Sequence, residues 1–291
     1  MCIRDRSFRE QKPFLINDVG DICPNLSKRS LAFAHQMGTQ SFICCPIICD
    51  GQSIGILAVD NLRSKRPLVQ SDLSLLMGIA SVIGISISNA ELMEARQRQF
   101  DSILQVLAAS IDARDPLTAG HSEKVTEYSL GICGQLNLSI QYREMIRVAS
   151  LLHDYGKIGV PDAILLAPRK LTPEEFEEVK KHSEKTKLIL DQVNFEGIFS
   201  QVPEIAGAHH EKMDGSGYPN GLKGDDIPLG AKIIAVADFF EAITAKRHYR
   251  DPMPFQKAES LLLQNAGNHF DEGIVSSFIS FYKRTYVDLL K

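Results

Sequence analysis

The stretch LLHDYGKIGVPD, residues 151–162, decides the fold, because it places two ionisable side chains directly after an apolar run. Residues 148–152 read VASLL, and His153 and Asp154 follow without a break. A carboxylate in such surroundings is expected to be buried, and an unpaired buried charge costs several kcal/mol. A bound cation would neutralise that charge. The stretch therefore indicates a metal site inside a helical core.

A second aspartate shows the same pattern, since Asp238 directly follows the apolar run IIAVA of residues 233–237. Five of the eight histidines fall between residues 121 and 210. Histidine taken alone is more often a hydrogen-bonded core residue, and His35, His248 and His269 are interpreted in that way. The whole set is harder to explain without metal. The candidate metal ligands are His121, His153, Asp154, His182, His209, His210 and Asp238.

Imidazole and carboxylate ligands together suit borderline divalent metals such as iron, manganese or zinc. Seven ligands are more than one ion needs, so the set predicts two ions that share a bridging carboxylate. Two ions about 3.5–4 Å apart can clamp the attacking and leaving oxygens of a phosphoryl transfer, and they lower the pKa of a shared water. The residues therefore favour phosphate-ester hydrolysis.

Three cationic side chains are candidates for binding phosphate. Lys157 lies one helical turn after Asp154, although a simple salt bridge between the two is the alternative. Arg247 and Arg250 follow Asp238, and arginine binds phosphate through paired hydrogen bonds. Two arginines near a helix end are also typical of a solvated surface, so both interpretations stay open.

Most of the chain after residue 100 has helical periodicity. Helices are expected near residues 121–137, 140–154, 172–193, 197–211, 230–247, 254–266 and 271–287. The third begins with Thr172-Pro173-Glu174-Glu175, which combines an N-cap, a proline at the first helical position and a capping-box glutamate. Residues 212–230 are rich in glycine and proline and predict a long loop, which in a compact domain is usually functional.

The chain before residue 90 is richer in strand signals. Residues 41–46 and 54–60 flank Asp50-Gly51, a strong hairpin turn signal. A proline-free segment over residues 71–115 then predicts a long helix with Ser71 as its N-cap. One apolar face has the 3-and-4 spacing of a coiled coil: Leu73, Leu76, Ala80, Ile83, Ile87 and Ala90. A second face follows: Phe100, Leu104, Leu107 and Ile111. Either the helix forms dimers, or each half packs on its own domain.

Composition limits the class of protein. The 291 residues are 44% hydrophobic and 23% charged, a soluble globular balance. The net charge of -4 argues against a surface for long nucleic acids. The six cysteines lack paired zinc-ligand spacing, which fits a reducing cytosol. The longest apolar run, residues 75–87, is shorter than the roughly 18–20 residues of a spanning helix, so we expect no membrane segment in this chain and a cytoplasmic location.

Several strings, in this order, resemble the HD-GYP family of bacterial cyclic di-GMP phosphodiesterases within the HD metallohydrolase superfamily. The strings are ARDPLTAGHS (113–122), LLHDYGKIGVPD (151–162), KKH (180–182), HHEKMDGSGYP (209–219) and AVADFFEAIT (235–244). The fourth string is highly specific, whereas a bare His-Asp pair is common. The resemblance covers about residues 100–281.

The resemblance implies an all-helical core with an iron or manganese site, in which the seven candidates are the ligands and Asp154 is the bridge. It implies hydrolysis of cyclic di-GMP to linear pGpG, with GMP as a further product to be tested. Lys157 would assist at the phosphate, while Arg247 and Arg250 would bind the dinucleotide. Tyr218 and the glycine-rich loop would shape the mouth of the site or contact partner proteins.

The chain departs from the family pattern at four positions. Members with a third metal can carry a glutamate where this chain has Leu117, so two metals are expected rather than three. Ser183 and Thr186 stand where the family often has proline and glycine, and His248 replaces a proline between the arginines. No ligand is lost, so activity is expected.

The N-terminal part resembles the second half of a GAF sensor domain through KPFLINDVGD (12–21), FICCPIICDGQSIGILAVDN (42–61) and SNAELMEAR (88–96). We therefore predict an α+β chain, with a partial α/β GAF-like domain over residues 1–88 and a connecting helix over 89–99. An all-α HD-GYP phosphohydrolase domain would follow over residues 100–291. The connecting helix is expected to join two copies in a homodimer, and the sensor domain to regulate the enzyme.

Two alternatives to this function stay open. A signalling scaffold could bind nucleotide or partner proteins without turnover, and loss of ligands would favour it, but none is lost. A metallohydrolase could instead act on another cyclic dinucleotide or on a nucleoside monophosphate. Substrate profiling separates that second alternative from cyclic di-GMP hydrolysis.

Overall fold

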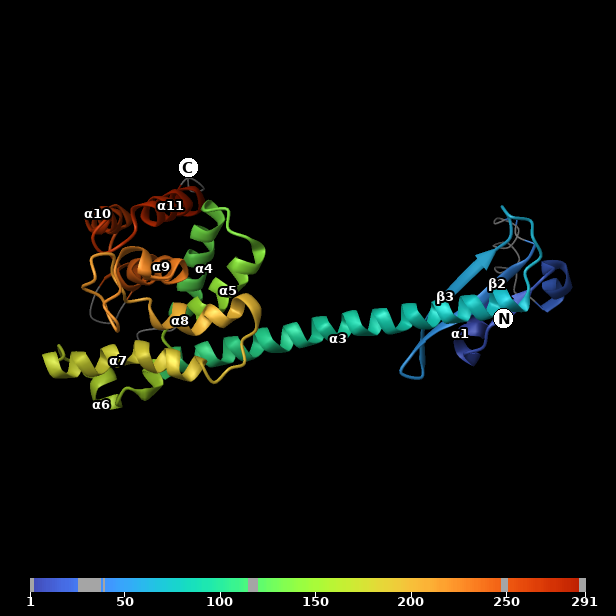
Figure 1. Ribbon diagram of the computed structural model, residues 1–291, viewed down its shortest axis with the longest axis horizontal. Coiled ribbons are helices and arrows are strands. Elements are labelled where there is room, and N and C mark those ends of the chain that lie inside the picture. Colours follow the sequence, from blue (N-terminus) through green and yellow to red (C-terminus); the bar gives the residue numbers. More distant parts are fainter. Residues whose placement is uncertain (1–2, 26–37, 39, 115–119, 247–250, 288–291) are drawn as a thin grey trace. The chain divides into compact units, whose positions relative to one another are not determined.

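The computed structural model describes residues 3–25, 38, 40–114, 120–246 and 251–287 (Figure 1). Contacts divide the chain into two compact units, Met1–Gln99 and Phe100–Lys291. Helix α3, Gln70–Arg114, includes the whole of the predicted connecting segment. Five residues on which sequence expectations rest lie outside the described residues: His35, Leu117, Arg247, His248 and Arg250.

The first unit contains a small antiparallel sheet in the order β1-β2-β3. Its elements are α1 (Ile3–Glu10), β1 (Phe14–Ile16), η1 (Val19–Asn25), β2 (Phe42–Cys49) and β3 (Gln52–Asp60). Asp50 and Gly51 join β2 to β3 with φ angles of 48° and 75°, as a two-residue hairpin turn requires. The predicted hairpin is therefore confirmed.

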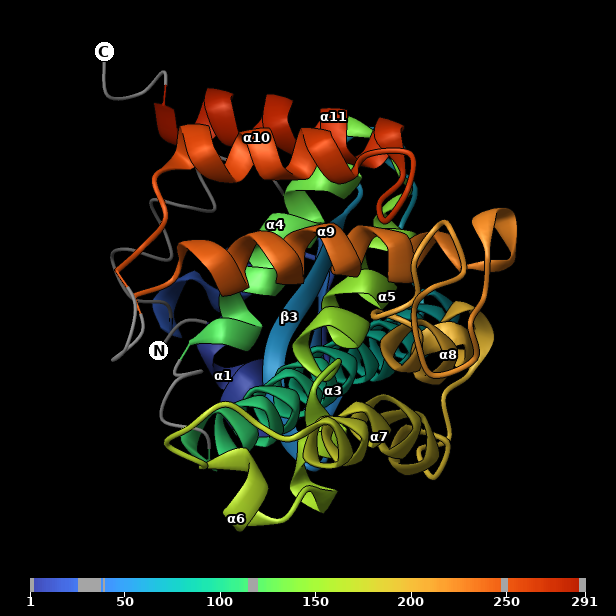
Figure 2. The same ribbon diagram turned by 90° about the vertical axis from the view of Figure 1, so that its left-hand side faces the viewer.

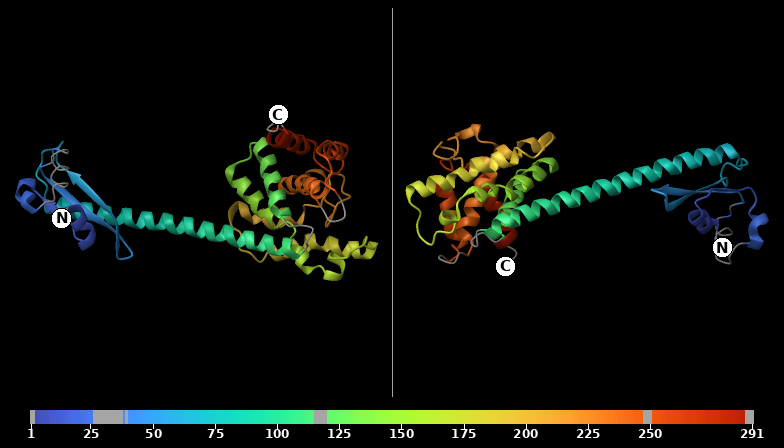
Figure 3. Two further views of the ribbon diagram at one scale, coloured as in Figure 1. Left: turned by 180° about the vertical axis from the view of Figure 1, so that it is seen from behind. Right: turned by 90° about the horizontal axis from the view of Figure 1, so that it is seen from below.

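The first turns of α3 lie beside this hairpin (Figure 3) and cover one face of its sheet. Leu73, Leu76 and Ala80 are buried in one cluster with Ile43 and Cys45 of β2. These three helix residues belong to the face predicted as a coiled-coil seam. These three side chains cannot line a dimer seam, because they form the core of their own unit.

The far end of α3 packs in the same manner on the second unit. Leu104 and Ala108 are buried in the helical core, with Phe100 and Leu107 against it. The alternative in which each half of the helix packs on its own domain is confirmed. The N-cap prediction is wrong, because Ser71 lies inside a helix that starts at Gln70.

The face of α3 turned away from the sheet is apolar and exposed, with Val82 at 63% and Ile85 at 58% exposure. Among the described residues, α3 is the one helix long and apolar enough to cross a membrane by length and composition. Its most apolar 18-residue window has a mean hydropathy of 1.8, and 17% of it is buried. The expectation of no such segment, drawn from residues 75–87, missed this window because the helix continues well beyond that run.

The second unit is built from helices (Figure 2), which confirms the all-helical prediction. Its longer helices are α4 (His121–Gln135), α5 (Ile140–Leu151), α7 (Pro173–Leu190), α9 (Leu229–Thr244), α10 (Phe255–Asn265) and α11 (Glu272–Tyr282). Short helical pieces are η2 (Tyr155–Gly159), α6 (Asp162–Leu165), η3 (Gly197–Gln201), α8 (Val202–Gly207), η4 (Gly224–Asp226) and η5 (Lys283–Val287). The helix predicted over 197–211 is two pieces that end before His209.

Helix α9 is the centre of this unit and packs against α4, α10 and α11 (Figure 2). Ile233, Ile234 and Phe240 are fully buried on it, as expected for a helix that is apolar nearly all round. The Phe240 ring meets those of Tyr128 and Phe278 edge-on, with centroids 5.5 and 4.7 Å apart. This packing fixes the helix that carries Asp238.

Helix α7 is held at both its start and its middle. The predicted capping box is present, because the Thr172 hydroxyl accepts from the Glu175 N–H at 3.2 Å and the Glu175 carboxylate accepts from the Thr172 N–H at 2.9 Å. Further along, the buried Thr186 hydroxyl donates to the His153 carbonyl at 3.0 Å and accepts from the Gly156 N–H at 2.8 Å. Thr186 thus ties α7 to the turn after α5.

We expect Thr186→Val to lower the free energy of unfolding of the metal-free protein by roughly 2–3 kcal/mol, because it leaves a buried donor and a buried acceptor without partners. Thr186→Ser keeps the hydroxyl and should cost much less. Urea unfolding followed by circular dichroism measures both changes. Wild-type stability in the valine variant, which keeps the methyl group, would show that the two hydrogen bonds contribute nothing here.

Candidate metal centre

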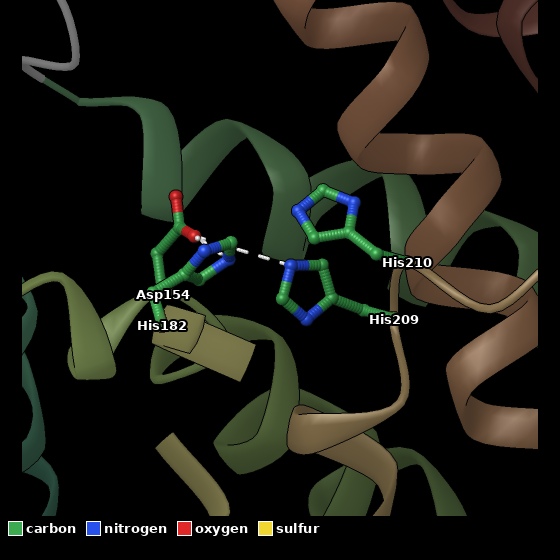
Figure 4. Close-up of side chains that lie close together, drawn as sticks. All are labelled: Asp154, His182, His209 and His210. Atoms are coloured by element: carbon green, nitrogen blue, oxygen red, sulfur yellow. Dashed lines mark ion pairs between the residues drawn. The ribbon is translucent and has the colours of Figure 1, made fainter. Parts of the chain in front are cut away.

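The structure brings all seven candidate ligands together from five helical segments. His121 is the first residue of α4, His182 lies on α7, and Asp238 lies on α9. His153 and Asp154 stand between the end of α5 and η2, and His209 and His210 follow α8. Figure 4 shows four of these side chains side by side.

The ligand atoms form two groups, within each of which the atoms lie no more than 4.8 Å from one another. The four-residue group consists of Asp154, His182, His209 and His210. The three-residue group consists of His121, His153 and Asp238. Each group has the size and the donor types of a site for one divalent ion.

Asp154 lies between the two groups and turns one carboxylate oxygen toward each. Its Oδ1 is 3.3 Å from His182 Nε2 and 3.9 Å from His209 Nε2 (Figure 4). Its Oδ2 is 3.6 Å from His153 Nε2 and 3.7 Å from His121 Nε2. This is the placement that a bridging carboxylate needs.

The ligand atoms of the three-residue group lie equally close to one another. His121 Nε2 lies 3.3 Å from both His153 Nε2 and Asp238 Oδ1. Sequence reasoning expected Asp238 to be buried, but its side chain keeps 16% exposure. The carboxylate points into the centre rather than into the apolar core around α9, which explains the difference.

The rings of three histidines are oriented so that Nε2 faces the centre. The Nδ1 atoms of His153, His182 and His209 lie 2.6–2.7 Å from the carbonyl oxygens three residues earlier, to which they donate. Such a bond fixes the tautomer and leaves Nε2 as the ligand atom. His209 Nε2 is buried without a hydrogen-bond partner among the described residues, so the donor set fits a metal.

The protonation states also suit ligand chemistry. Burial lowers the pKa of His182, His209 and His210, in the last case to about 3. Nearby positive charge acts in the same direction on each of them. These rings are therefore neutral at pH 7, with lone pairs available on nitrogen.

Opposite charges lie close together around Asp154 and His121. Burial raises the pKa of Asp154, but Lys157 and the surrounding histidines outweigh it and hold the pKa well below its usual range. Burial lowers the pKa of His121, but hydrogen bonds to Asp238 and Glu241 raise it to about 10. Without metal, a proton on His121 balances part of the carboxylate charge that an ion would otherwise balance.

The predicted substrate contacts lie beside the centre where the structure describes them. Lys157 Nζ donates to Asp154 Oδ2 and its side chain keeps 19% exposure. The salt bridge that sequence reasoning weighed is thus present. The Tyr218 ring lies 4.7 Å from that of His210, and burial raises the pKa of its phenol. Arg247 and Arg250 lie outside the described residues.

Sequence reasoning missed several residues that surround the ligands. Glu241 contacts His121, and its position three residues after Asp238 on one helix face was a usable signal. Lys180, within the quoted KKH string, places Nζ 5.6 Å from the centre of the Tyr218 ring. Buried Glu211 accepts from the backbone N–H groups of residues 220 and 222 at 2.7 and 2.9 Å, which holds the loop that carries Tyr218.

Comparison with known proteins gives two family matches. A model described as HD domain matches residues 105–274, and a model described as GAF domain matches residues 2–87. Both resemblances seen in the sequence are thereby confirmed.

Three curated relatives illustrate the similarity. A probable cyclic di-GMP phosphodiesterase of Vibrio cholerae is 37% identical over 205 residues, covering 66% of this chain and 46% of the relative. A 3'3'-cGAMP-specific phosphodiesterase of the same organism is 43% identical over 171 residues, covering 59% and 36%. A cyclic di-GMP phosphodiesterase of Thermotoga maritima is 40% identical over 181 residues, covering 62% and 49%. The chain spans less than half the length of these relatives.

We expect Asp154→Ala to lose both metal ions, because one carboxylate oxygen faces each group. Asp238→Ala should lose only the ion of the three-residue group and keep the other. Elemental analysis of protein dialysed against a limiting Mn(II) buffer gives the ratio of metal to protein. Wild-type metal content in Asp154→Ala would show that Asp154 is no bridge.

Proposed function

The chain belongs to the HD domain family, as its resemblance to HD-GYP proteins predicted, and on that premise we propose that it is a metal-dependent phosphodiesterase acting on a cyclic dinucleotide. The observation that carries this proposal is the convergence of seven ligands in two groups around Asp154. Similarity to relatives named for cyclic di-GMP and 3'3'-cGAMP hydrolysis supports the substrate class. We propose cyclic di-GMP as substrate and pGpG as first product, with GMP as a later one.

We propose two divalent ions as cofactors, either iron or manganese, at the four-residue and three-residue groups. Five imidazoles and two carboxylates make up these groups, and borderline metals prefer such donors. When bound, the ions supply hydroxide at neutral pH and neutralise charge on the phosphate. The protein's own side chains would bind and orient the substrate.

The side chains around the centre can bind and orient the dinucleotide. Lys157, whose Nζ contacts Asp154 Oδ2 and whose side chain keeps 19% exposure, would bind a phosphate oxygen of the dinucleotide. Tyr218 walls the site beside His210 and adds a neutral hydroxyl. We propose that Arg247 and Arg250 bind the dinucleotide, on the sequence pattern alone. We propose also that the glycine-rich loop contacts partner proteins.

We propose that the N-terminal domain regulates this site through the end of α3. Arg114 in the last turn of α3 donates to the carbonyl oxygens of Lys157 and Val160 at 2.8 and 2.6 Å. Asp112 accepts from the Ser122 hydroxyl at 2.8 Å, directly beside His121. A displacement of this turn would therefore act on Lys157 and on a metal ligand together. A cytoplasmic location of the domain remains an expectation.

We further propose a homodimer formed through the exposed face of α3, opposite the face predicted from the sequence. Leu75, Val82, Ile85 and Leu92 are more than half exposed there, and their separations of 7, 3 and 7 residues fit a heptad repeat. Asn89 occupies a position of the same repeat. A polar asparagine within an apolar seam is typical of a two-stranded coiled coil.

The double substitution Val82→Asp and Ile85→Asp should convert a dimer to a monomer, because it places charge in the seam without touching the core of either unit. Glu94→Lys, also on the exposed part of α3 but off the seam, should leave the dimer intact. Sedimentation velocity over a range of protein concentrations distinguishes the two. An unchanged mass would exclude this seam, and binding of the wild type to phospholipid vesicles would point to a membrane surface instead.

Protein loaded anaerobically with Fe(II) or Mn(II) should convert cyclic di-GMP to pGpG, with 3'3'-cGAMP and cyclic di-AMP tested in parallel by chromatography. Lys157→Met should keep both ions but lose roughly 10²-fold in kcat/KM, since one charged group at the phosphate is removed. Metal-loaded protein that turns over none of these substrates would favour the scaffold alternative. Faster turnover of another dinucleotide would move the assignment to that substrate.

A further inference from the structure

The ring of His121 is held differently from those of the other buried ligands. His153, His182 and His209 each donate from Nδ1 to a backbone carbonyl three residues earlier. His121 is the first residue of its helix. Its Nδ1 lies 2.5 Å from Oε2 of Glu241, a side chain on α9. A charged carboxylate thus takes the place that a neutral carbonyl has elsewhere.

The fold fixes Glu241 in this position. It is buried, and it lies three residues after Asp238, so that both carboxylates project from one face of α9. Asp238 Oδ1 is 3.3 Å from His121 Nε2, while Glu241 Oε2 contacts the opposite nitrogen. The imidazole is therefore fixed from both ends by a single helix.

We propose that Glu241 is a positioning residue of the metal centre, which accepts the Nδ1 proton of His121, presents Nε2 as the ligand atom and sets the affinity of the three-residue group for its ion. This inference rests on the two-ion centre proposed above. A carboxylate partner makes an imidazole a stronger donor than a carbonyl does, and it fixes the ring orientation through a charge-assisted hydrogen bond.

The proposed role is selective for one of the two ions. Glu241 reaches the centre through His121, which belongs to the three-residue group. The rings of His182 and His209, in the four-residue group, are oriented by backbone carbonyls that a substitution at position 241 does not remove. Loss of the Glu241 carboxylate should therefore weaken one ion and spare the other.

The competing explanation is that Glu241 only stabilises the packing of α4 on α9. A purely structural contact would lower stability without changing the ratio of metal to protein in the folded molecules. Glu241→Gln separates the two explanations, because the amide oxygen still accepts from Nδ1 but carries no charge. Glu259→Ala is the matched control, since it removes a carboxylate that joins α10 to Lys283 at 2.6 Å, away from the ligands.

The experiment measures Mn(II) stoichiometry and affinity by elemental analysis and chelator competition, and the coupling between two ions by electron paramagnetic resonance. Wild type and Glu259→Ala should bind two coupled ions. Glu241→Ala should bind the second ion about 10–100-fold more weakly, the range found when such outer partners are removed, and lose the coupled signal at limiting metal. Glu241→Gln should bind two ions, with an affinity for the second ion between those of Glu241→Ala and the wild type, because the hydrogen bond is kept and the charge is lost.

The possible results distinguish the role of Glu241 from the proposed function and from the two-ion centre. Two ions of wild-type affinity in Glu241→Ala would overturn the positioning role. If that variant does not fold, unchanged second-ion affinity in Glu241→Gln would overturn the charge-assisted part, and a lowered one supports it. A wild type that binds two ions without hydrolysing any dinucleotide contradicts the proposed function but leaves the role of Glu241 standing. A wild type with fewer than two ions removes the centre on which the inference rests.

Discussion

The buried carboxylate of Asp154 is the constraint on which the second unit depends. Its charge sits almost fully enclosed, at the end of an apolar helix, and the fold surrounds it with four imidazoles and one ammonium. Such a charge is tolerated only where cations or strong donors converge on it. The partners come from residues 121 to 209, so α4, α7 and the turns after α5 and α8 meet around one pair of oxygen atoms.

Much of this arrangement follows from sequence because the relevant signals are local. Apolar runs that end in His153-Asp154 and in Asp238 indicated candidate ligands, and helical periodicity placed them on separate elements. Lys157 lies near Asp154 simply because one turn separates them. Partners that depend on tertiary packing were harder to foresee. Glu241 meets His121 across 120 residues of chain, and its place three residues after Asp238 indicated its helix face but not this partner.

In helix α3 the apolar spacing was identified correctly, but what that face packs against was not. Leu73, Leu76 and Ala80 have coiled-coil spacing, but the same spacing also suits a helix that covers a sheet. Periodicity identifies an apolar face without identifying what covers it. The helix predicted over residues 197–211 is instead two pieces that end before His209. The sequence did not show this end, because the residues there are still compatible with a helix.

Arg114 donates to main-chain oxygens of Lys157 and Val160. Among the described residues its side-chain partner is Asp162, which lies at the edge of that turn. Every amino acid offers a carbonyl group. The bond between this arginine and the turn therefore places few demands on which residues occupy positions 157–160, and it can persist while they change over evolutionary time. A turn that we propose binds substrate can in this way change its side chains without being disconnected from the end of α3.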